Sequence, residues 1–204
     1  MLDAVPLSAT GIGLDSDFAA ITHGRSLAKG RGRTERVELR HADARTESPA
    51  RADAGICIGA SQIWGPPVEE AQPLDYAAAL TALRARVPHG GRVLYGESIW
   101  SQPPTPQATA PLAGRDDEYV TLPELLELAV RHGFAPVQVH DASLDEWDHL
   151  ESGYSARYAR WLAAHDADHA DSGEVPQRAA RQRSAYYSGY RGTLGFAHLA
   201  LIAV

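Results

Sequence analysis

Hydrophobic and polar residues follow one another along this chain in patterns that predict a series of strands. Residues 9–14 are small and apolar and stop at Asp15, which is typical of a short buried strand ending at an acidic residue. The continuous apolar run at residues 54–59 indicates a strand in a sheet covered on both faces. Further strands are predicted at residues 36–43, 92–97, 136–140 (with Val137 and Val139 on one face) and 194–203.

Helices are predicted between these strands, where apolar residues recur at helical spacing behind a capping residue. Ser16 or Asp17 can cap the first helix, and Thr121 and Ser143 each begin a capping box because a glutamate follows three residues later. The segment 101–114 holds four prolines and little periodicity, so we expect a loop there. The helices are expected at residues 18–29, 75–87, 122–132, 144–161 and 175–187.

Strands that alternate with helices predict an α/β fold with a mainly parallel sheet. The 204 residues suit a single domain, with a helical insertion at about residues 143–190 before the last strand. Hydrophobic residues make up 44% of the chain, which is enough for a sizeable core.

The net charge limits the kinds of partner that we expect, and the cysteine content indicates the compartment. The formal net charge is −7, and an acidic chain is disfavoured as a nucleic-acid or anionic-membrane binder because both reward an excess of Lys and Arg. The single cysteine, Cys57, cannot form an internal disulfide, which favours a reducing, cytoplasmic location. No apolar run approaches the roughly 20 residues that cross a bilayer. We therefore expect neither a nucleic acid nor a membrane as the main partner.

The order of these elements, together with the residues at the strand ends, resembles the class I S-adenosylmethionine-dependent methyltransferases. The likeness extends over essentially the whole chain and is strongest to small-molecule enzymes of actinobacterial type, through the segments 146–154 and 190–195. The matching strand ends are Gly13-Leu14-Asp15, Ala42-Asp43-Ala44 and Ile58-Gly59-Ala60-Ser61, followed by the glycine turn at 88–91 and the closing strand.

The resemblance implies a Rossmann-like sheet that is mainly parallel with an antiparallel last strand, helices on both faces, and S-adenosylmethionine as the cofactor. Asp15 and Ser16 would lie at the ribose, since a carboxylate can accept both hydroxyls of a diol. Asp43 and Ala44 would lie beside the adenine, and the turn of Gly59, Ala60 and Ser61 would cover the cofactor. The plainer alternatives are that Asp15 only caps a helix, that Asp43 is a solvated strand end, and that residues 59–61 only form a tight turn.

The spacing Gly11-x-Gly13 looks like half of a dinucleotide fingerprint, but the resemblance assigns it to the second strand of the family. The first strand and its glycine-rich loop then have no counterpart before residue 9. We expect a chain truncated at its N-terminus; a strand supplied by another chain and a degenerate paralogue are the alternatives. Open strand edges would favour self-association, so a homo-oligomer is also expected.

Methyl transfer is an in-line displacement, so the protein mainly has to align the acceptor and exclude water. Glu97 ends a strand on the pocket side of this fold and could orient or deprotonate the acceptor; a strand-end carboxylate without a role is the alternative. Trp64, Trp100 and Tyr154 could wall an apolar substrate pocket, although such aromatics are more often plain core.

Two clusters of polar residues are assigned no chemistry. The histidines and aspartates at 165–171 are metal-ligand types, but an acidic solvated connector between helices accounts for them, and we predict no metal site. The cations at 29–33 are expected to be a solvated helix end. The sequence thus favours S-adenosylmethionine-dependent methyl transfer to a small organic acceptor, impaired by the truncation. A non-catalytic remnant that binds a partner is the first alternative, and a nicotinamide-dependent oxidoreductase is the second.

Overall fold

The structure is a computed structural model that describes residues 6–47, 51–65, 73–166 and 168–204. The chain divides into two compact units, residues 1–52 and residues 53–204, and each has its own sheet. The expectation of a single domain stays a prediction.

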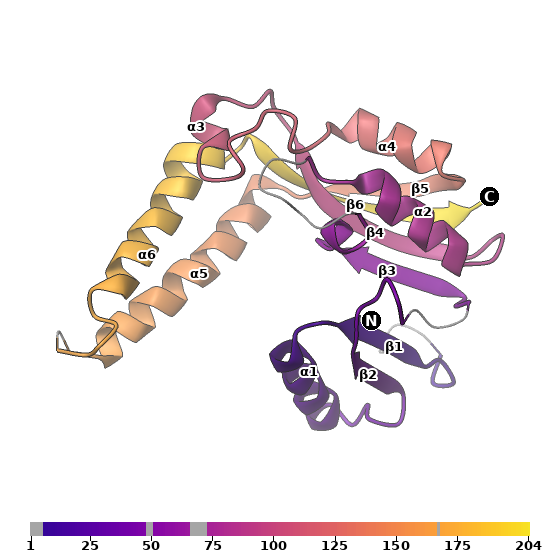
Figure 1. The fold of residues 1–204 in the computed structure, drawn as a ribbon, viewed down its shortest axis with the longest axis horizontal. Helices are drawn as coiled ribbons and strands as arrows, with labels where there is room; N and C mark the ends of the chain where they lie inside the picture. Colours follow the sequence, from indigo (N-terminus) through magenta and orange to yellow (C-terminus); the bar gives the residue numbers. More distant parts are fainter. Residues whose placement is uncertain (1–5, 48–50, 66–72, 167) are drawn as a thin grey trace. The chain divides into compact units, whose positions relative to one another are not determined.

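The first unit is a two-stranded parallel sheet with one helix (Figure 1). Strand β1 (Gly11–Asp15) pairs with β2 (Val37–His41), and α1 (Phe18–Gly30) connects them. The Gly11-x-Gly13 spacing therefore lies in a strand, as predicted. A Cβ atom on Gly13 or on Gly24 would come within 2.7 or 2.8 Å of a Leu39 methyl group, so both glycines make room for this side chain between strand and helix.

The second unit contains a four-stranded sheet in the order β3-β4-β6-β5. Strands β3 (Ala54–Ile58) and β4 (Arg92–Trp100) are parallel, and β6 (Leu194–Ala203) is antiparallel to both β4 and β5 (Phe134–Asp141). The sheet is thus mixed α/β with an antiparallel last strand, as the resemblance implied. In β5 the register shifts between Pro136 and Gln138, so Val137 has no paired residue in β6. Val137 and Val139 are both exposed, and their position on one face stays a prediction.

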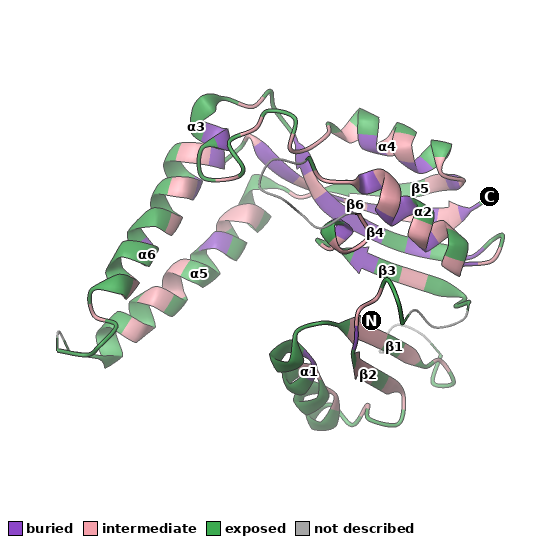
Figure 2. Cartoon of the chain, in the orientation of Figure 1, coloured by how far each residue is buried: buried purple, intermediate pink, exposed green. Residues whose placement is uncertain are grey.

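The core of the second unit lies between one face of its sheet and the helices α2 (Tyr76–Arg86) and α4 (Leu122–Arg131). Burial is concentrated in β4 and β6 (Figure 2). On β3 only Cys57 is buried, whereas Ile56 and Ile58 keep 45% and 42% of their surface exposed. The apolar run of β3 is therefore buried on one face only, which corrects the expectation that it is covered on both.

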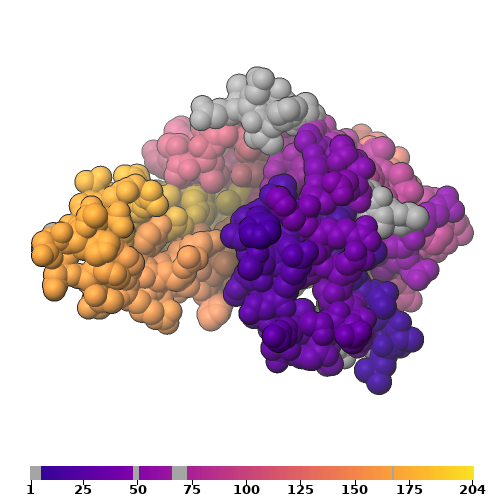
Figure 3. All heavy atoms as spheres, turned by 60° about the horizontal axis from the view of Figure 1, so that its bottom comes forward, coloured from indigo at the N-terminus to yellow at the C-terminus, as the bar shows by residue number. Residues whose placement is uncertain are grey.

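The helical insertion follows β5 and comprises α5 (Leu144–Ala164), α6 (Glu174–Ser184) and a π-helical turn, η2 (Ala185–Tyr190). The side chains of α5 and α6 lie side by side in orange and yellow in the space-filling view (Figure 3). The segment expected to be a loop contains a short helix, α3 (Pro106–Thr109), which packs against η2. A second core cluster forms there from Trp100, Ala108, Tyr186, Tyr190 and Leu194. No helix among the described residues is long and apolar enough to span a bilayer.

Candidate functional site

The carboxyl edge of the first unit's sheet carries Asp15. Its side chain is exposed, and Oδ1 accepts the Asp17 backbone N–H at 2.8 Å. Asp17, rather than Ser16, caps α1, because its carboxylate accepts the Ala19 N–H at 2.7 Å. The second oxygen of Asp15 has no hydrogen-bond partner among the described residues, so it can accept a hydroxyl donor. The Ser16 carbonyl accepts a hydrogen bond from His41 Nε2 at 3.0 Å.

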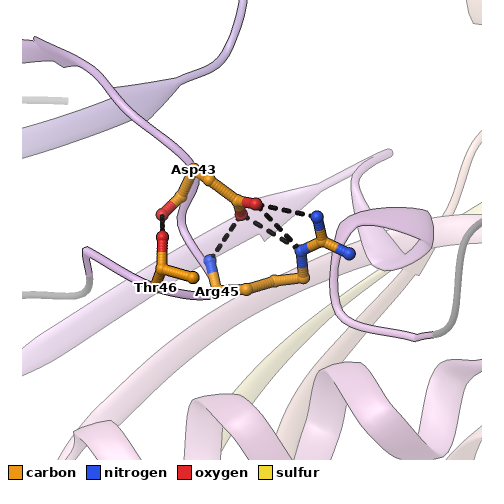
Figure 4. A network of polar contacts seen from close by, with 3 residues as sticks. All are labelled: Asp43, Arg45 and Thr46. Carbon is orange, nitrogen blue, oxygen red and sulfur yellow. Dashed lines mark hydrogen bonds and ion pairs between the residues drawn. The ribbon is translucent and has the colours of Figure 1, made fainter.

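Asp43 follows β2 at the same edge, since the Ala42 N–H bonds to the Asp15 carbonyl at 2.9 Å. Figure 4 shows that its carboxylate faces Arg45, whose guanidinium contacts both oxygens at 2.7–3.1 Å. The Arg45 backbone N–H adds a further bond at 2.9 Å. These hydrogen bonds lower the pKa of Asp43, so the group is ionised and held in place. Ala44 lies between the two partners.

In the second unit, the turn after β3 is fixed by a buried polar network. Gly59 has φ +59°, a left-handed conformation that favours glycine, and its N–H bonds to the Gly96 carbonyl at 2.8 Å. Ala60 follows it, half-buried. Ser61 is fully buried, and its hydroxyl shares a hydrogen bond of 2.6 Å with the Tyr95 hydroxyl. The Ser61 N–H donates to Glu97 Oε2 at 3.1 Å, so the turn is tied to the adjacent strand.

Glu97 is only 4% exposed, although we expected it at the end of a strand on the pocket side of the fold. Strand β4 continues three residues past it to Trp100, which places Glu97 inside the strand. Its Oε1 accepts the Ser98 N–H at 3.0 Å. Burial raises the pKa of Tyr76, Tyr95 and Tyr119 around it, and the negative charge of Glu97 adds to that increase. The observed role of Glu97 is to hold the turn; a catalytic role stays a prediction.

The three aromatic residues suggested as a pocket wall have different surroundings in the second unit. Trp64 packs on the main core of the second unit, with the Arg86 guanidinium 4.6 Å from its ring centre. Trp100 belongs to the second core cluster, where its indole N–H donates to the Asp116 carbonyl at 2.8 Å. Tyr154 is exposed on α5. Their assignment to one substrate pocket therefore remains a prediction.

The histidines at the end of α5 form an aromatic cluster. His165 stacks on Trp161 with ring centres 4.3 Å apart, and His169 contacts both rings edge-on. Within the described ranges, no three His, Cys, Asp or Glu side chains are grouped so that they could hold a metal ion. Cys57 is buried, which raises the pKa of its thiol and keeps it protonated.

One feature of the second unit was not predicted from the sequence. A groove of about 670 Å³ lies between α3, α5 and the α6–η2 segment, and it is lined by Arg178, Arg181 and Gln182 among others. These residues recur at helical spacing along residues 175–187, which is the signal that could have identified a common face. The opposite walls come from segments distant in sequence, and no local pattern predicts their meeting.

Comparison with known proteins gives likenesses over nearly the whole chain. No family model matches. The uncharacterised protein YjhP of Escherichia coli (strain K12) is 29% identical over 198 residues, which is 95% of this chain and 75% of that protein.

Two crystal structures of S-adenosylmethionine-dependent methyltransferases in complex with S-adenosyl-L-homocysteine superimpose closely. The enzyme from Geobacter sulfurreducens has a TM-score of 0.80 at 29% identity, and the enzyme from Thiobacillus denitrificans has a TM-score of 0.79 at 28% identity. In each case the match covers 96% of this chain and 76% of the other.

Proposed function

We propose that this chain, whose fold is that of the class I S-adenosylmethionine-dependent methyltransferases, binds S-adenosylmethionine and transfers a methyl group to a small organic acceptor. The observation that carries the proposal is the likeness over 96% of the chain to two enzymes solved with the demethylated product of that cofactor. The exposed Asp15 carboxylate at the end of β1 also supports the proposal, because one of its oxygens has no hydrogen-bond partner within the described ranges.

The proposed cofactor residues fall into one group in each unit. In the first unit, the free oxygen of Asp15 accepts the ribose hydroxyls with Ser16 beside it, and Asp43 with Ala44 borders the adenine. Arg45 holds the Asp43 carboxylate in one orientation. We therefore assign this carboxylate the role of a fixed wall beside the adenine. In the second unit, the Gly59–Ser61 turn presents backbone to the cofactor, because small residues let a ligand approach closely.

Bound S-adenosylmethionine supplies a methyl group activated by a sulfonium centre. The residues of the chain have to align the acceptor and exclude water, because the leaving group is neutral. Glu97 holds the turn that we assign to the cofactor, through the Ser61 N–H at 3.1 Å. Direct deprotonation of an acceptor by Glu97 requires that its buried carboxylate become reachable. The reduced thiol of Cys57 supports a cytoplasmic location.

Isothermal calorimetry with S-adenosylmethionine and S-adenosyl-L-homocysteine tests the proposal. We expect Asp15→Asn to weaken binding of both by about tenfold or more, since an amide accepts at one atom only. The asparagine keeps an oxygen for the Asp17 N–H, so this hydrogen bond at the start of the helix is preserved. Glu38→Gln is the matched control, because Glu38 is exposed on β2 and pairs with Arg40. Equal affinities of the wild type and Asp15→Asn would contradict the assignment.

The alternative is a methyltransferase-fold domain that binds without catalysis. It is favoured by the open backbone edges of the end strands in the described residues, because such an edge can pair with a partner chain. These end strands are β1 and β2 in one sheet and β3 and β5 in the other. Cofactor heat without any methylated product across a panel of acceptors would support this alternative. No heat with either compound at high concentration would overturn the proposed function itself.

A further inference from the structure

The groove of about 670 Å³ in the second unit has the size of a small-molecule site. One wall is the face of α6 and η2 that carries Arg178, Arg181, Ser184 and Ser188. Tyr158 of α5 lines it as well, and the residues around α3 close it from the other side. Three elements that are separate in sequence thus converge on one hollow.

The charged side chains that line the groove are positive, whereas the chain as a whole carries a negative net charge. The net charge of the whole sequence is −7, yet the charged side chains that line the groove are Arg178 and Arg181. No Asp or Glu is among the described residues that line it. Arg178 forms an ion pair with Glu174, which lies one turn earlier on α6. Arg181 has no side-chain partner in the described parts of the chain, so its guanidinium is available to a ligand.

The elements that form the groove also pack at the carboxyl end of β4, and the carboxyl ends of strands are where ligands of α/β sheets bind. Trp100, the last residue of β4, packs with Ala108 of α3 and with Tyr186 and Tyr190 of η2. These are the same two elements whose outer surfaces form two of the groove's walls. The groove is therefore formed by the same two elements that pack against the last residue of the strand that carries Glu97.

The walls are tightly packed and held by polar contacts. A Cβ atom on Gly189 would lie 3.0 Å from the Gln107 carbonyl oxygen and 3.1 Å from Pro111, so η2 lies in close contact with the α3 segment. On the α5 side, Gln182 donates to the buried Glu151 carboxylate at 2.6 Å. The η2 segment is π-helical, and such turns are frequent at functional sites.

We propose that this groove binds a small organic anion, a carboxylate or a phosphate ester, whose acid group is held by Arg181 with help from Arg178. An arginine presents two parallel N–H donors that match the oxygens of either group. The hydroxyls of Ser184 and Ser188 provide further donors on the same face. The assignment of this anion as the methyl acceptor rests on the proposed function, whereas anion binding itself does not.

Binding is tested on the full chain without cofactor, in low salt, by calorimetry or by NMR shifts. The probes are succinate for a carboxylate, glucose 6-phosphate for a phosphate ester, and glucose as the neutral control. We expect at least one anion to bind while glucose does not. Arg181→Gln should weaken that binding by about tenfold, and added NaCl should weaken it further. The stronger of the two anions identifies the chemical class.

Arg183→Gln is the matched control, because Arg183 is exposed on the same helix and does not line the groove. It should leave the affinity unchanged within about twofold. Glu174→Gln should strengthen binding, because it releases Arg178 from its ion pair. Absence of anion binding up to the order of 10 mM, or an equal loss in Arg183→Gln and Arg181→Gln, would overturn the proposal.

The role as acceptor site has a separate readout. With labelled S-adenosylmethionine, a mixture of acids that contain the better-binding group should give a methylated product, and Arg181→Gln should raise KM for it with unchanged cofactor affinity. Anion binding without methylation of any member would confine the inference to binding. Failure of the cofactor to bind in calorimetry would instead reject the proposed function and leave the anion result standing.

Discussion

At the scale of single residues, Glu97 decides how the turn after β3 is held. A buried carboxylate is costly unless its oxygens accept hydrogen bonds, and here each oxygen accepts one backbone N–H, from Ser61 or from Ser98. Ser61 belongs to the turn assigned to the cofactor, and Ser98 follows Glu97 in β4. The side chain therefore supports the position of that turn whether or not it also takes part in chemistry.

We expect Glu97→Gln to lower the free energy of unfolding by about 1–3 kcal/mol, because an amide NH₂ would face one of the two N–H donors. Urea denaturation measures this change. Glu127→Gln, on the exposed side of α4, is the control and should change stability by less than about 0.5 kcal/mol. If Glu97 only positions the turn, cofactor affinity falls together with stability. A loss of turnover at unchanged affinity would identify a catalytic group instead.

At the scale of elements, the helical insertion is joined to η2 by two carboxylates of α5. Asp148 accepts the Tyr186 hydroxyl at 2.7 Å and a two-pronged ion pair from Arg191 at 2.8 Å. Glu151 accepts the Tyr190 hydroxyl at 2.8 Å. Because Tyr186 and Tyr190 also belong to the second core cluster with Trp100, these contacts connect the insertion to the end of the sheet.

The contribution of this connection to the stability of the fold should depend on pH. The hydrogen bonds from Arg191 and Tyr186 lower the pKa of Asp148 from its usual 3.8 to about 2. A carboxylate with a lowered folded-state pKa stabilises the fold above its unfolded value and loses that contribution as pH falls through the folded one. We therefore expect stability to fall between about pH 4 and pH 2, and Asp148→Asn to remove part of that dependence.

Thermal unfolding followed by circular dichroism across that pH range measures the effect. Asp166→Asn, beyond the far end of α5 in an exposed position, is the control and should keep the wild-type profile. An identical pH profile for Asp148→Asn and the wild type would show that the contact contributes nothing to stability.

At the scale of the whole molecule, the two units differ in how much core they have. Among the described residues, the buried apolar side chains of the first unit are Ile21 and Ala42, whereas the second unit buries an extended set around Tyr95, Leu80 and Leu199. A small core stabilises a unit little, because burial of apolar area is the main favourable term in folding. The first unit should therefore open more readily than the second.

Hydrogen exchange measured by mass spectrometry checks this difference. Amides of β1 and β2 should exchange faster than those of β4 and β6, and S-adenosyl-L-homocysteine should slow exchange around Asp15 if the proposed function holds. Equal protection of both units would contradict the expectation. Sedimentation velocity of the same sample tests the predicted self-association, which open strand edges favour.

The sequence by itself determined the elements, because their signals are local. The capping boxes at Thr121 and Ser143 begin α4 and α5 where predicted, and the strand at Gly11–Asp15 ends at the expected acidic residue. The antiparallel last strand was implied by the resemblance, and the pairing of β6 with β4 and β5 confirms it. Helix caps and strand alternation depend on neighbours a few residues away, and these are readable along the chain.

Only the tertiary structure decided which side chains are buried and which of them meet. Glu97 looked like a strand-end carboxylate, but three further residues of β4 and the turn after β3 bury it. Trp100 is buried because α3, a short helix inside the proline-rich segment, and η2 both pack against it. The groove at Arg181 exists because that packing brings together segments about 70 residues apart. Such contacts depend on long-range packing, for which no local pattern carries a signal.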